Sequence, residues 1–463
     1  MTVCESADRP GGAMRTEELT LPGFHHDTFS AVYPSAAASP VFARMPLAEH
    51  GLQWTHPRAC MAHPLDAGDA VVLYRDVRST AETLERQRPG DGTRWIEFAD
   101  PYLRHFDALR DTTLAPFPPA RGALRLLLAA GPGASCDLLR LVGGSSVGLA
   151  QRLFEGEGSR AWLYGSAMHG DAPLRSAGSG LAAVYLQLLG HAVGWPSPRG
   201  GAECLTDALV SYLISLGGEI RTGARVEHIT SRGGRVRGVC LAAGQEIAAG
   251  VVVADVMPHA LVRMTGDALS AWYRRALGRY LYGPATLKVD WALKTAIPWL
   301  NSEVARAGTV HIGGSEHEML TSPRSAFVLL GQQSIADPSR APSGRHTAWA
   351  YTRLTEPSDA SPRMVERLEA QVERFAPGFR DAILARHVLR PGDLQARNAN
   401  LVGGDVGGGS TTLRQVVFRP LPKLSPYSTP LRGLFMGSAA TFPGAAVHGV
   451  PGDAAARAAL RQR

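Results

Sequence analysis

Lysine, cysteine and charged residues in general are scarce in this chain of 463 residues. Charged residues make up 19% of the chain and hydrophobic residues 45%, which excludes a mainly disordered protein. Lysine occurs only at positions 288, 294 and 423, and all other basic residues are arginines spread along the chain. A nucleic-acid-binding protein usually gathers its basic residues on one face or tail, so the net charge of +7 does not predict nucleic-acid binding.

The cysteines are also too few and too far apart to form a site. No two of the five are spaced as CxxC, which argues against a disulfide framework, a metal site or a redox dithiol: Cys4, Cys60, Cys136, Cys204 and Cys240. No run of about 18 apolar residues predicts a membrane span. The first residues lack the apolar core of a secretion signal, so we expect a cytoplasmic protein.

The first half of the chain alternates between strand-like and helical patterns. Thr2–Glu5 is typical of the end of a strand, and residues from about Thr80 to Leu189 are mostly helical in pattern. A helix is predicted over Ala202–Leu216, followed by strands at 219–222, 226–230 and 236–241. Val251–Asp255 has the continuous apolar character of a strand buried in a parallel sheet, so the fold class is α/β.

The second half of the chain predicts a mixed α+β domain, followed by a short C-terminal segment that belongs to the first domain. Strands are expected at 287–291, 327–332 and 346–351, and a helix at 362–375. Near the C-terminus, a strand at 434–437 precedes a Pro-Gly loop and a closing helix from about 452 to 460. No internal repeat is visible.

Four segments far apart in the sequence together resemble one family. They are Cys4–Thr16 (CESADRPGGAMRT), Trp195–Gly201 (WPSPRGG), Gly223–Ile229 with the later Val253–Asp255, and Gly433–Ala439 with Pro443–Gly449. Their order resembles the FAD-dependent phytoene desaturase-like oxidoreductases of the amine oxidase superfamily. It is also similar to the pyridine nucleotide-disulfide oxidoreductase domain 2 proteins. The resemblance implies a Rossmann-like FAD/NAD(P)-binding domain, with FAD as the cofactor.

The N-terminal motif carries the first group of expected FAD contacts. Glu5 stands where the family's acid binds the ribose hydroxyls. Gly11 and Gly12 would let the backbone approach the cofactor, because neither has a Cβ. Arg15 and Thr16 would offer hydrogen-bond donors to the pyrophosphate.

The later motifs supply the remaining expected contacts. The resemblance implies that the backbone at Val226 lies against the adenine and that Gly437 admits the ribityl chain. Arg199 is a candidate contact to cofactor or substrate. In the loop before the last helix, which would face the flavin ring, the candidates are Gly444, Val447, His448 and Gly449. The sequence assigns no catalytic acid or base and no metal site.

Each of these residues also has a simpler structural interpretation. Glu5 alone is typical of a solvated charge, and Gly11-Gly12 of a plain turn. Asp255 could cap the following helix. His25 and His26 are more typical of packing than of metal ligation, because no third ligand is suitably spaced. For His448, a structural role is favoured over a direct role in the chemistry.

The sequence departs from the family pattern at its start. The glycine-rich GxGxxG loop and its strand and helix normally precede the ribose acid by about 20 residues, and no such segment fits before Glu5. One explanation is that Met1 is an internal residue and that the native protein carries about 30 more residues before it. The other is a remnant fold that binds no FAD. We favour the first.

The resulting hypothesis divides the chain into three parts. Residues 1–74, 194–257 and 425–463 would form a discontinuous FAD-binding domain, 75–193 a helical insert, and 258–424 a mixed α+β substrate domain. The expected reaction is hydride removal from a C–H bond of a small apolar, isoprenoid or lipid-like substrate to flavin. One alternative is a non-redox binding or scaffold protein on the same fold. Another is contact with a membrane surface through basic residues.

Overall fold

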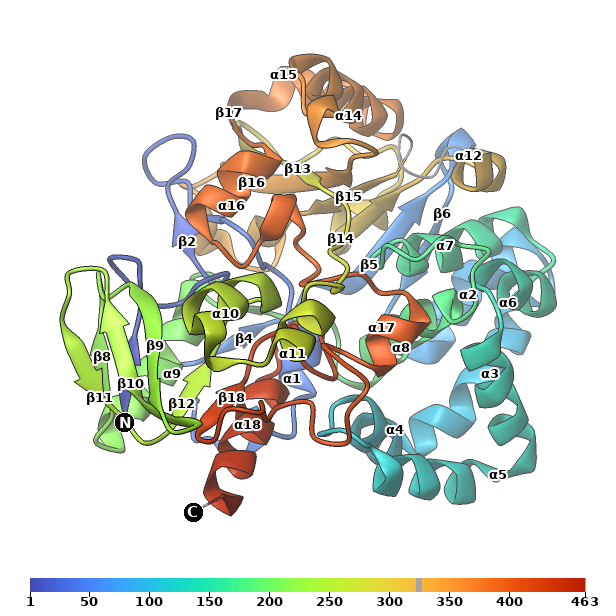
Figure 1. Ribbon diagram of the computed structural model, residues 1–463. Coiled ribbons are helices and arrows are strands. Elements are labelled where there is room, and N and C mark those ends of the chain that lie inside the picture. The colour runs from blue at the N-terminus through green and yellow to red at the C-terminus, as the bar shows by residue number, and fades with distance from the viewer. Residues whose placement is uncertain (322–326, 463) are drawn as a thin grey trace.

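A seven-stranded sheet is the largest element of the computed structural model, which describes residues 1–321 and 327–462 (Figure 1). The strand order is β17-β13-β16-β15-β14-β5-β6, and only the β14–β5 pair is parallel. The bounds are β5 (Ala59–Pro64), β6 (Ala70–Leu73), β13 (Thr286–Leu293), β14 (Ala307–Ile312), β15 (Val328–Gly331), β16 (His346–Arg353) and β17 (Ile383–Leu389). The strands expected within 287–351 are confirmed.

Strands β5 and β6 do not follow the division expected from the sequence. They were expected in the nucleotide-binding part, residues 1–74, but β5 pairs with β14, where Met61 lies opposite Thr309. Every residue of β5 and β6 is buried, so these strands lack the alternation of a half-exposed strand. The boundary between the nucleotide-binding part and the large sheet therefore lies before Ala59, and not at Tyr74 as the division of the chain predicts.

Short parallel ladders form a second group of strands. β1 (Thr2–Cys4) pairs with β8 (Glu219–Arg221), and β12 (Val252–Ala254) pairs with β18 (Leu434–Met436). Beside them lies an antiparallel sheet of β9 (Val226–Arg232), β10 (Arg235–Leu241) and β11 (Glu246–Ala248). Two-residue pairs join β2 (Thr16–Glu17) to β3 (His26–Asp27) and β4 (Trp54–Thr55) to β7 (Ser197–Pro198).

One expectation about this group is only half right. The strand at Val252–Ala254 exists and its pairing is parallel, but it lies in a ladder of two strands. The side chain of Val253 is 44% exposed, so the strand is not buried on both faces as predicted. Cys4, Val226, Ala254 and Met436 nevertheless pack in one hydrophobic cluster, which holds the ladders together.

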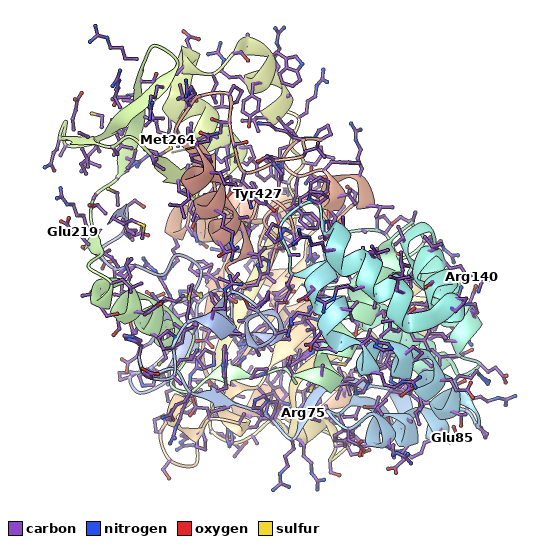
Figure 2. The ribbon with its side chains drawn as sticks, turned by 90° about the horizontal axis from the view of Figure 1, so that it is seen from below. Arg75, Glu85, Arg140, Glu219, Met264 and Tyr427 are labelled. Atoms are coloured by element: carbon purple, nitrogen blue, oxygen red, sulfur yellow. The ribbon has the colours of Figure 1, made fainter. Side chains whose placement is uncertain are left out.

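The helical region expected from about Thr80 to Leu189 is confirmed. Its helices form one side of the molecule, with Glu85 and Arg140 on that side and Glu219 on the opposite one (Figure 2). Trp95 and Trp162 are fully buried among them, with ring centroids 5.2 Å apart. The helices are α2 (Val77–Gln87), α3 (Asp91–Arg104), α4 (Phe106–Thr113), α5 (Ala120–Gly143), α6 (Ser146–Leu153), α7 (Glu157–Ala167) and α8 (Ser179–Ala192).

The remaining helices cover the sheets and close the chain. On α14, Leu368, Val372 and Phe375 are buried at helical spacing, which turns this face toward the large sheet. The helices are α1 (Pro34–Ala37), α9 (Glu203–Ser215), α10 (Pro258–Thr265), α11 (Ala271–Leu277), α12 (Glu316–Thr321), α14 (Pro362–Phe375), α15 (Phe379–Ala382), α16 (Pro391–Arg397), α17 (Leu413–Val417) and α18 (Val450–Arg461).

Two further expectations concern cysteines and membrane spans. All five cysteines are free, as predicted. Within the described ranges, no single helix is long and apolar enough to cross a membrane. One bent pair, Ala120–Gly133 with Ser135–Gly143, passes that test by length and composition only.

Candidate cofactor and substrate site

The carboxyl end of β1 places Glu5 beside the start of β9. The Glu5 amide donates to the carbonyl of Arg221 (2.9 Å), and the Ala224 amide donates to the Glu5 carbonyl (2.8 Å). Val226 begins β9 two residues later, so these two predicted adenosine contacts lie close together. One Glu5 oxygen, Oε1, accepts from the Ala7 amide at 2.8 Å. Among the described residues, nothing donates to its Oε2.

The carboxyl ends of β12 and β18 meet the same region. The Gly437 amide donates to the Ala254 carbonyl (3.0 Å), and a Cβ on Gly437 would lie 3.1 Å from Cγ1 of Val253. Asp255 follows β12 and is exposed. Desolvation by the neighbouring protein atoms and the charge of Glu5 raise the pKa of Asp255 to about 6. Glu5, Val226, Gly437 and Asp255 therefore gather where parallel strands end.

Asp255 is not the helix cap that its sequence position suggested. The N-cap of α10 is Met257, whose side chain makes no capping hydrogen bond. The Asn400 side chain holds this segment instead, because it accepts from the Met257 amide and donates to the Asp255 carbonyl. The Asp255 carboxyl group is therefore left facing Glu5.

The glycine pair after β1 has two different environments. A Cβ on Gly11 would lie 2.8 Å from the Met14 carbonyl and 2.9 Å from Oγ1 of Thr206, so the protein's own packing requires glycine there. Gly12 has only the Asn398 side chain near its Cβ position, at 3.7 Å. Nη2 of Arg15 donates to the Arg9 carbonyl, and its Nε is buried without a partner. The open side of this turn and the unsatisfied Nε suit an anionic ligand group.

Thr16 has protein partners instead. Its hydroxyl donates to Asp27 (2.9 Å) and accepts from the Glu203 amide (3.2 Å). Asp27 also forms a buried ion pair with Arg340 (2.8 Å) and accepts from the Ala202 amide (2.8 Å). Asp27 thus joins the N-terminal motif, the PRGG turn and the segment around Arg340.

Arg199 lies in the same turn, but its side chain is exposed. Its Nη1 is 3.4 Å from Oε1 of Gln53, and its backbone amide donates to the Gln53 carbonyl (2.8 Å). The next amide, of Gly200, donates to Asp337 (2.7 Å). These bonds fix the turn, and a contact between Arg199 and a ligand stays a prediction.

The loop before α18 is held by its own histidine. Nδ1 of His448 accepts from the Val450 amide (3.2 Å), and Nε2 lies 3.2 Å from the Ala445 carbonyl. Burial lowers the pKa of His448 to about 4, so the ring is neutral at physiological pH. The neutral ring thus links the loop to the first residue of α18, and a contact from His448 to a ligand stays a prediction.

The glycines and valine of this loop are also packed against protein. Val447 packs beside Tyr33 and Leu47 in a hydrophobic cluster. Gly449, with φ +70°, would bring a Cβ to 2.9 Å from the Phe42 ring. The guanidinium of Arg419 fills the space beside Gly444. Contacts from these residues to a flavin therefore stay predictions.

His25 and His26 lie near this network and hold no metal in the described structure. The His26 ring is buried, with Nε2 2.8 Å from the Thr20 hydroxyl and Nδ1 3.8 Å from Asp290. Burial lowers the pKa of His26 to about 3, so it is a neutral packing residue. In the described parts of the chain, no group of three or more His, Cys, Asp or Glu is placed to hold a metal ion.

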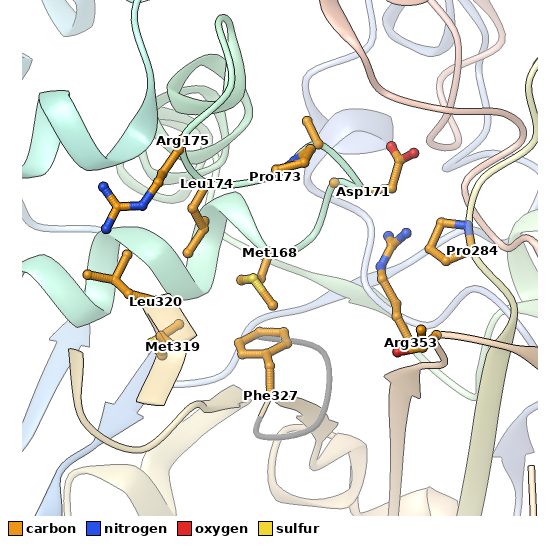
Figure 3. A pocket seen from close by; sticks show the side chains of 13 residues that line it. Met168, Asp171, Pro173, Leu174, Arg175, Pro284, Met319, Leu320, Phe327 and Arg353 are labelled. Carbon is orange, nitrogen blue, oxygen red and sulfur yellow. The ribbon is translucent and has the colours of Figure 1, made fainter. Parts of the chain in front are cut away.

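A cavity of about 470 Å³ lies between the helical side and the large sheet (Figure 3). Apolar side chains form most of its wall: Met168, Leu174, Pro284, Met319, Leu320 and Phe327. Asp171 and Arg353 lie at one side, with the Arg353 guanidinium turned toward Asp171, and Arg175 lies at the opposite side beside Leu320. The wall comes from several distant segments, so no local sequence signal could have found it.

Hydrogen bonds connect the polar side of the cavity to the loop that precedes α18. Asp171 accepts hydrogen bonds from the amide and hydroxyl of Thr411. Burial would raise the pKa of Asp171, but these bonds and the charge of Arg353 outweigh it and lower that pKa. Arg419 donates to the carbonyls of Ser410 and Ala439, both at 3.0 Å, and fills the space beside Gly444. The cavity and the loop predicted to face a flavin are thus neighbours.

Three buried histidines lie behind the cavity wall. Nε2 of His169 is 2.7 Å from Nε2 of His311, and the Nδ1 atoms of His63 and His311 have no partner. Burial lowers the pKa of His63 to about 4 and of His169 to about 3, so these rings are uncharged. His169 follows Met168 in the wall, and its carbonyl accepts from Arg353. No sequence pattern marks this cluster.

The chain is similar in sequence to a family of flavin-containing proteins. A family model described as flavin containing amine oxidoreductase matches residues 1–459. The chain is 26% identical over 513 residues to a pyridine nucleotide-disulfide oxidoreductase domain-containing protein 2 of Rattus norvegicus, covering 97% of this chain and 87% of that protein. It is 25% identical over 284 residues to a lycopene-forming phytoene desaturase of Paracoccus sp., covering 56% and 54%.

Solved structures share the fold over nearly the whole chain. An oxidoreductase from Methanosarcina mazei superposes with a TM-score of 0.65 at 16% identity, covering 99% of this chain and 93% of that one. A putrescine oxidase bound to putrescine gives 0.62 at 16% identity, covering 100% and 93%. These similarities confirm the predicted α/β fold with a Rossmann-like part.

Proposed function

The chain belongs to the flavin-containing amine oxidoreductases and is a flavin-dependent oxidoreductase, and we propose that it binds FAD and oxidises an apolar substrate. The observation that carries the cofactor proposal is that Glu5, at the end of β1, lies near Asp255 and Gly437 at the ends of β12 and β18, with Val226 opening β9 beside it. Ligands of open α/β sheets bind at such carboxyl ends.

The chemistry of these residues fits a dinucleotide. Oε2 of Glu5 is available to accept from ribose hydroxyls, and the buried Nε of Arg15 lacks an acceptor that a phosphate oxygen could supply. The Cβ position of Gly437 faces Val253 and helix α18, so its glycine allows β18 and α18 to pack closely at this strand end. Flavin, when bound, supplies the acceptor for a hydride.

The cavity supports an isoprenoid or lipid-like substrate. Its apolar wall favours a hydrocarbon chain and excludes water from the reacting C–H bond. The likeness to phytoene desaturases points the same way, whereas putrescine, the ligand of one structural neighbour, is a diamine. Asp171 and Arg353 would orient a polar group of the substrate at one side.

A binding titration of FAD tests the cofactor site. Glu5→Gln removes the charge that accepts ribose hydroxyls, so we expect the Kd for FAD to rise about tenfold, the worth of one good hydrogen bond to a charged group. Glu246→Gln, an exposed position on β11, is the control and should leave the Kd unchanged. An unchanged Kd for Glu5→Gln would place the ribose elsewhere.

A further inference from the structure

Helix α5 exposes a row of aliphatic side chains that no other part of the described chain covers. The exposed fractions are 58% for Leu124, 38% for Leu127, 76% for Leu128, 68% for Leu139 and 39% for Val142. On the opposite face, Leu126 and Leu141 are buried in the helical core. The helix is therefore anchored by one apolar face and presents a second apolar face outward.

The shape of α5 places two groups of exposed aliphatic side chains, at 124–128 and 139–142, at the edge of the molecule. The helix bends at Gly131, where φ is +81°, just before Pro132, so its two halves form an angled pair. Both halves lie on the outer rim of the helical side, away from the sheets (Figure 1). Monomeric proteins rarely expose contiguous apolar surface of this kind unless it meets a partner or a membrane.

Basic residues flank the aliphatic row. Arg121, Arg125 and Arg140 are exposed on the same helix. Asp111 pairs with Arg125 at 3.3 Å and Asp137 with Arg140 at 3.3 Å, whereas Arg121 has no partner among the described residues. At a bilayer surface, such leucine side chains enter the apolar interior and the flanking arginines bind the anionic headgroups. We propose that α5 docks on an anionic lipid surface without spanning it.

The end of α5 is connected by hydrogen bonds to a segment that lines the cavity. The Gly178 amide donates to the Gly144 carbonyl (2.7 Å), just after α5 ends, and the Ser146 hydroxyl donates to the Leu174 carbonyl (2.8 Å). Leu174 and Arg175 line the cavity. A lipid-like substrate could therefore pass from the bilayer to the cavity. This delivery rests on the proposed function, but the docking itself does not.

Vesicle flotation of the full chain tests the docking. Vesicles of phosphatidylcholine with phosphatidylglycerol should carry the protein upward, and vesicles of phosphatidylcholine alone should carry less. Removing one leucine from water favours association by about tenfold, so Leu128→Ser with Leu139→Ser should lower binding by at least that factor. The control pair, Leu216→Ser with Leu460→Ser, changes leucines that are 67% and 65% exposed, and should bind normally.

Three outcomes would overturn the proposal. They are no flotation of the wild-type chain, equal flotation of the Leu128/Leu139 variant, and a dimer on size exclusion that this variant dissociates. The last result would assign the row to a second copy of the chain. Thermal unfolding of each variant checks that it folds. FAD titration of the Leu128/Leu139 variant separates the two proposals, because docking fails there while flavin binding should not.

Discussion

The buried ion pair between Asp27 and Arg340 predicts the largest loss of stability near the site. The exposed side-chain fractions are 0% and 1%, and the oxygen that Arg340 approaches also accepts from Thr16 and Ala202. Asp27→Asn keeps the shape but leaves the guanidinium of Arg340 as an unpaired buried charge. Breaking such a pair costs about 3–5 kcal/mol, a large part of the roughly 5–15 kcal/mol that holds a domain folded.

Urea unfolding followed by tryptophan fluorescence measures this cost. Arg340→Met in the Asp27→Asn background should restore part of the lost free energy, because it removes the unpaired charge. Arg44→Gln is the control, since its pair with Asp453 is exposed and worth at most about 1 kcal/mol. A loss below about 1 kcal/mol for Asp27→Asn would refute the view that this pair holds the three segments together.

Two further predictions concern the strand ends and the glycine turn. Desolvation by the neighbouring protein atoms and the charge of Glu5 raise the pKa of Asp255 to about 6, so the folded protein keeps a proton that the unfolded chain loses above about pH 4. The free energy of unfolding should therefore fall as the pH rises from about 4 to 6, and Asp255→Asn should abolish that fall. Urea titrations across this range that show the same pH dependence for the wild-type chain and the variant would contradict the prediction. Gly11→Ala should cost about 3 kcal/mol or more, because its Cβ would lie 2.8 Å from a carbonyl. Gly217→Ala, at a φ of +79° with open space around its Cβ position, should cost about 1–2 kcal/mol in the same assay.

Local patterns predicted most elements of the fold. The helix at Pro362–Phe375 and the strands on either side of the turn at Arg232–Arg235 follow from spacing and turn residues that the chain carries nearby. The pairing of β5 with β14 could not be predicted in this way, because both strands are buried on both faces and their partners lie far apart in sequence.

The site was predictable only where a motif marks it. The N-terminal motif located Glu5, and the C-terminal motif located Gly437. No motif marks Asp27 with Arg340, His169 with His311, or the cavity wall, because each depends on tertiary packing of segments that are distant in the sequence. The sequence did not favour a direct chemical role for His448, and its ring accepts a hydrogen bond from the Val450 amide, a contact between neighbouring residues that the motif did not mark.

The absorption spectrum of the purified protein during titration with FAD shows whether the strand ends bind a flavin. We expect a visible flavin band that is perturbed relative to free FAD and saturates at one flavin per chain. A chain that stays colourless after added FAD is removed by gel filtration, while its unfolding transition shows that it is folded, would refute FAD binding.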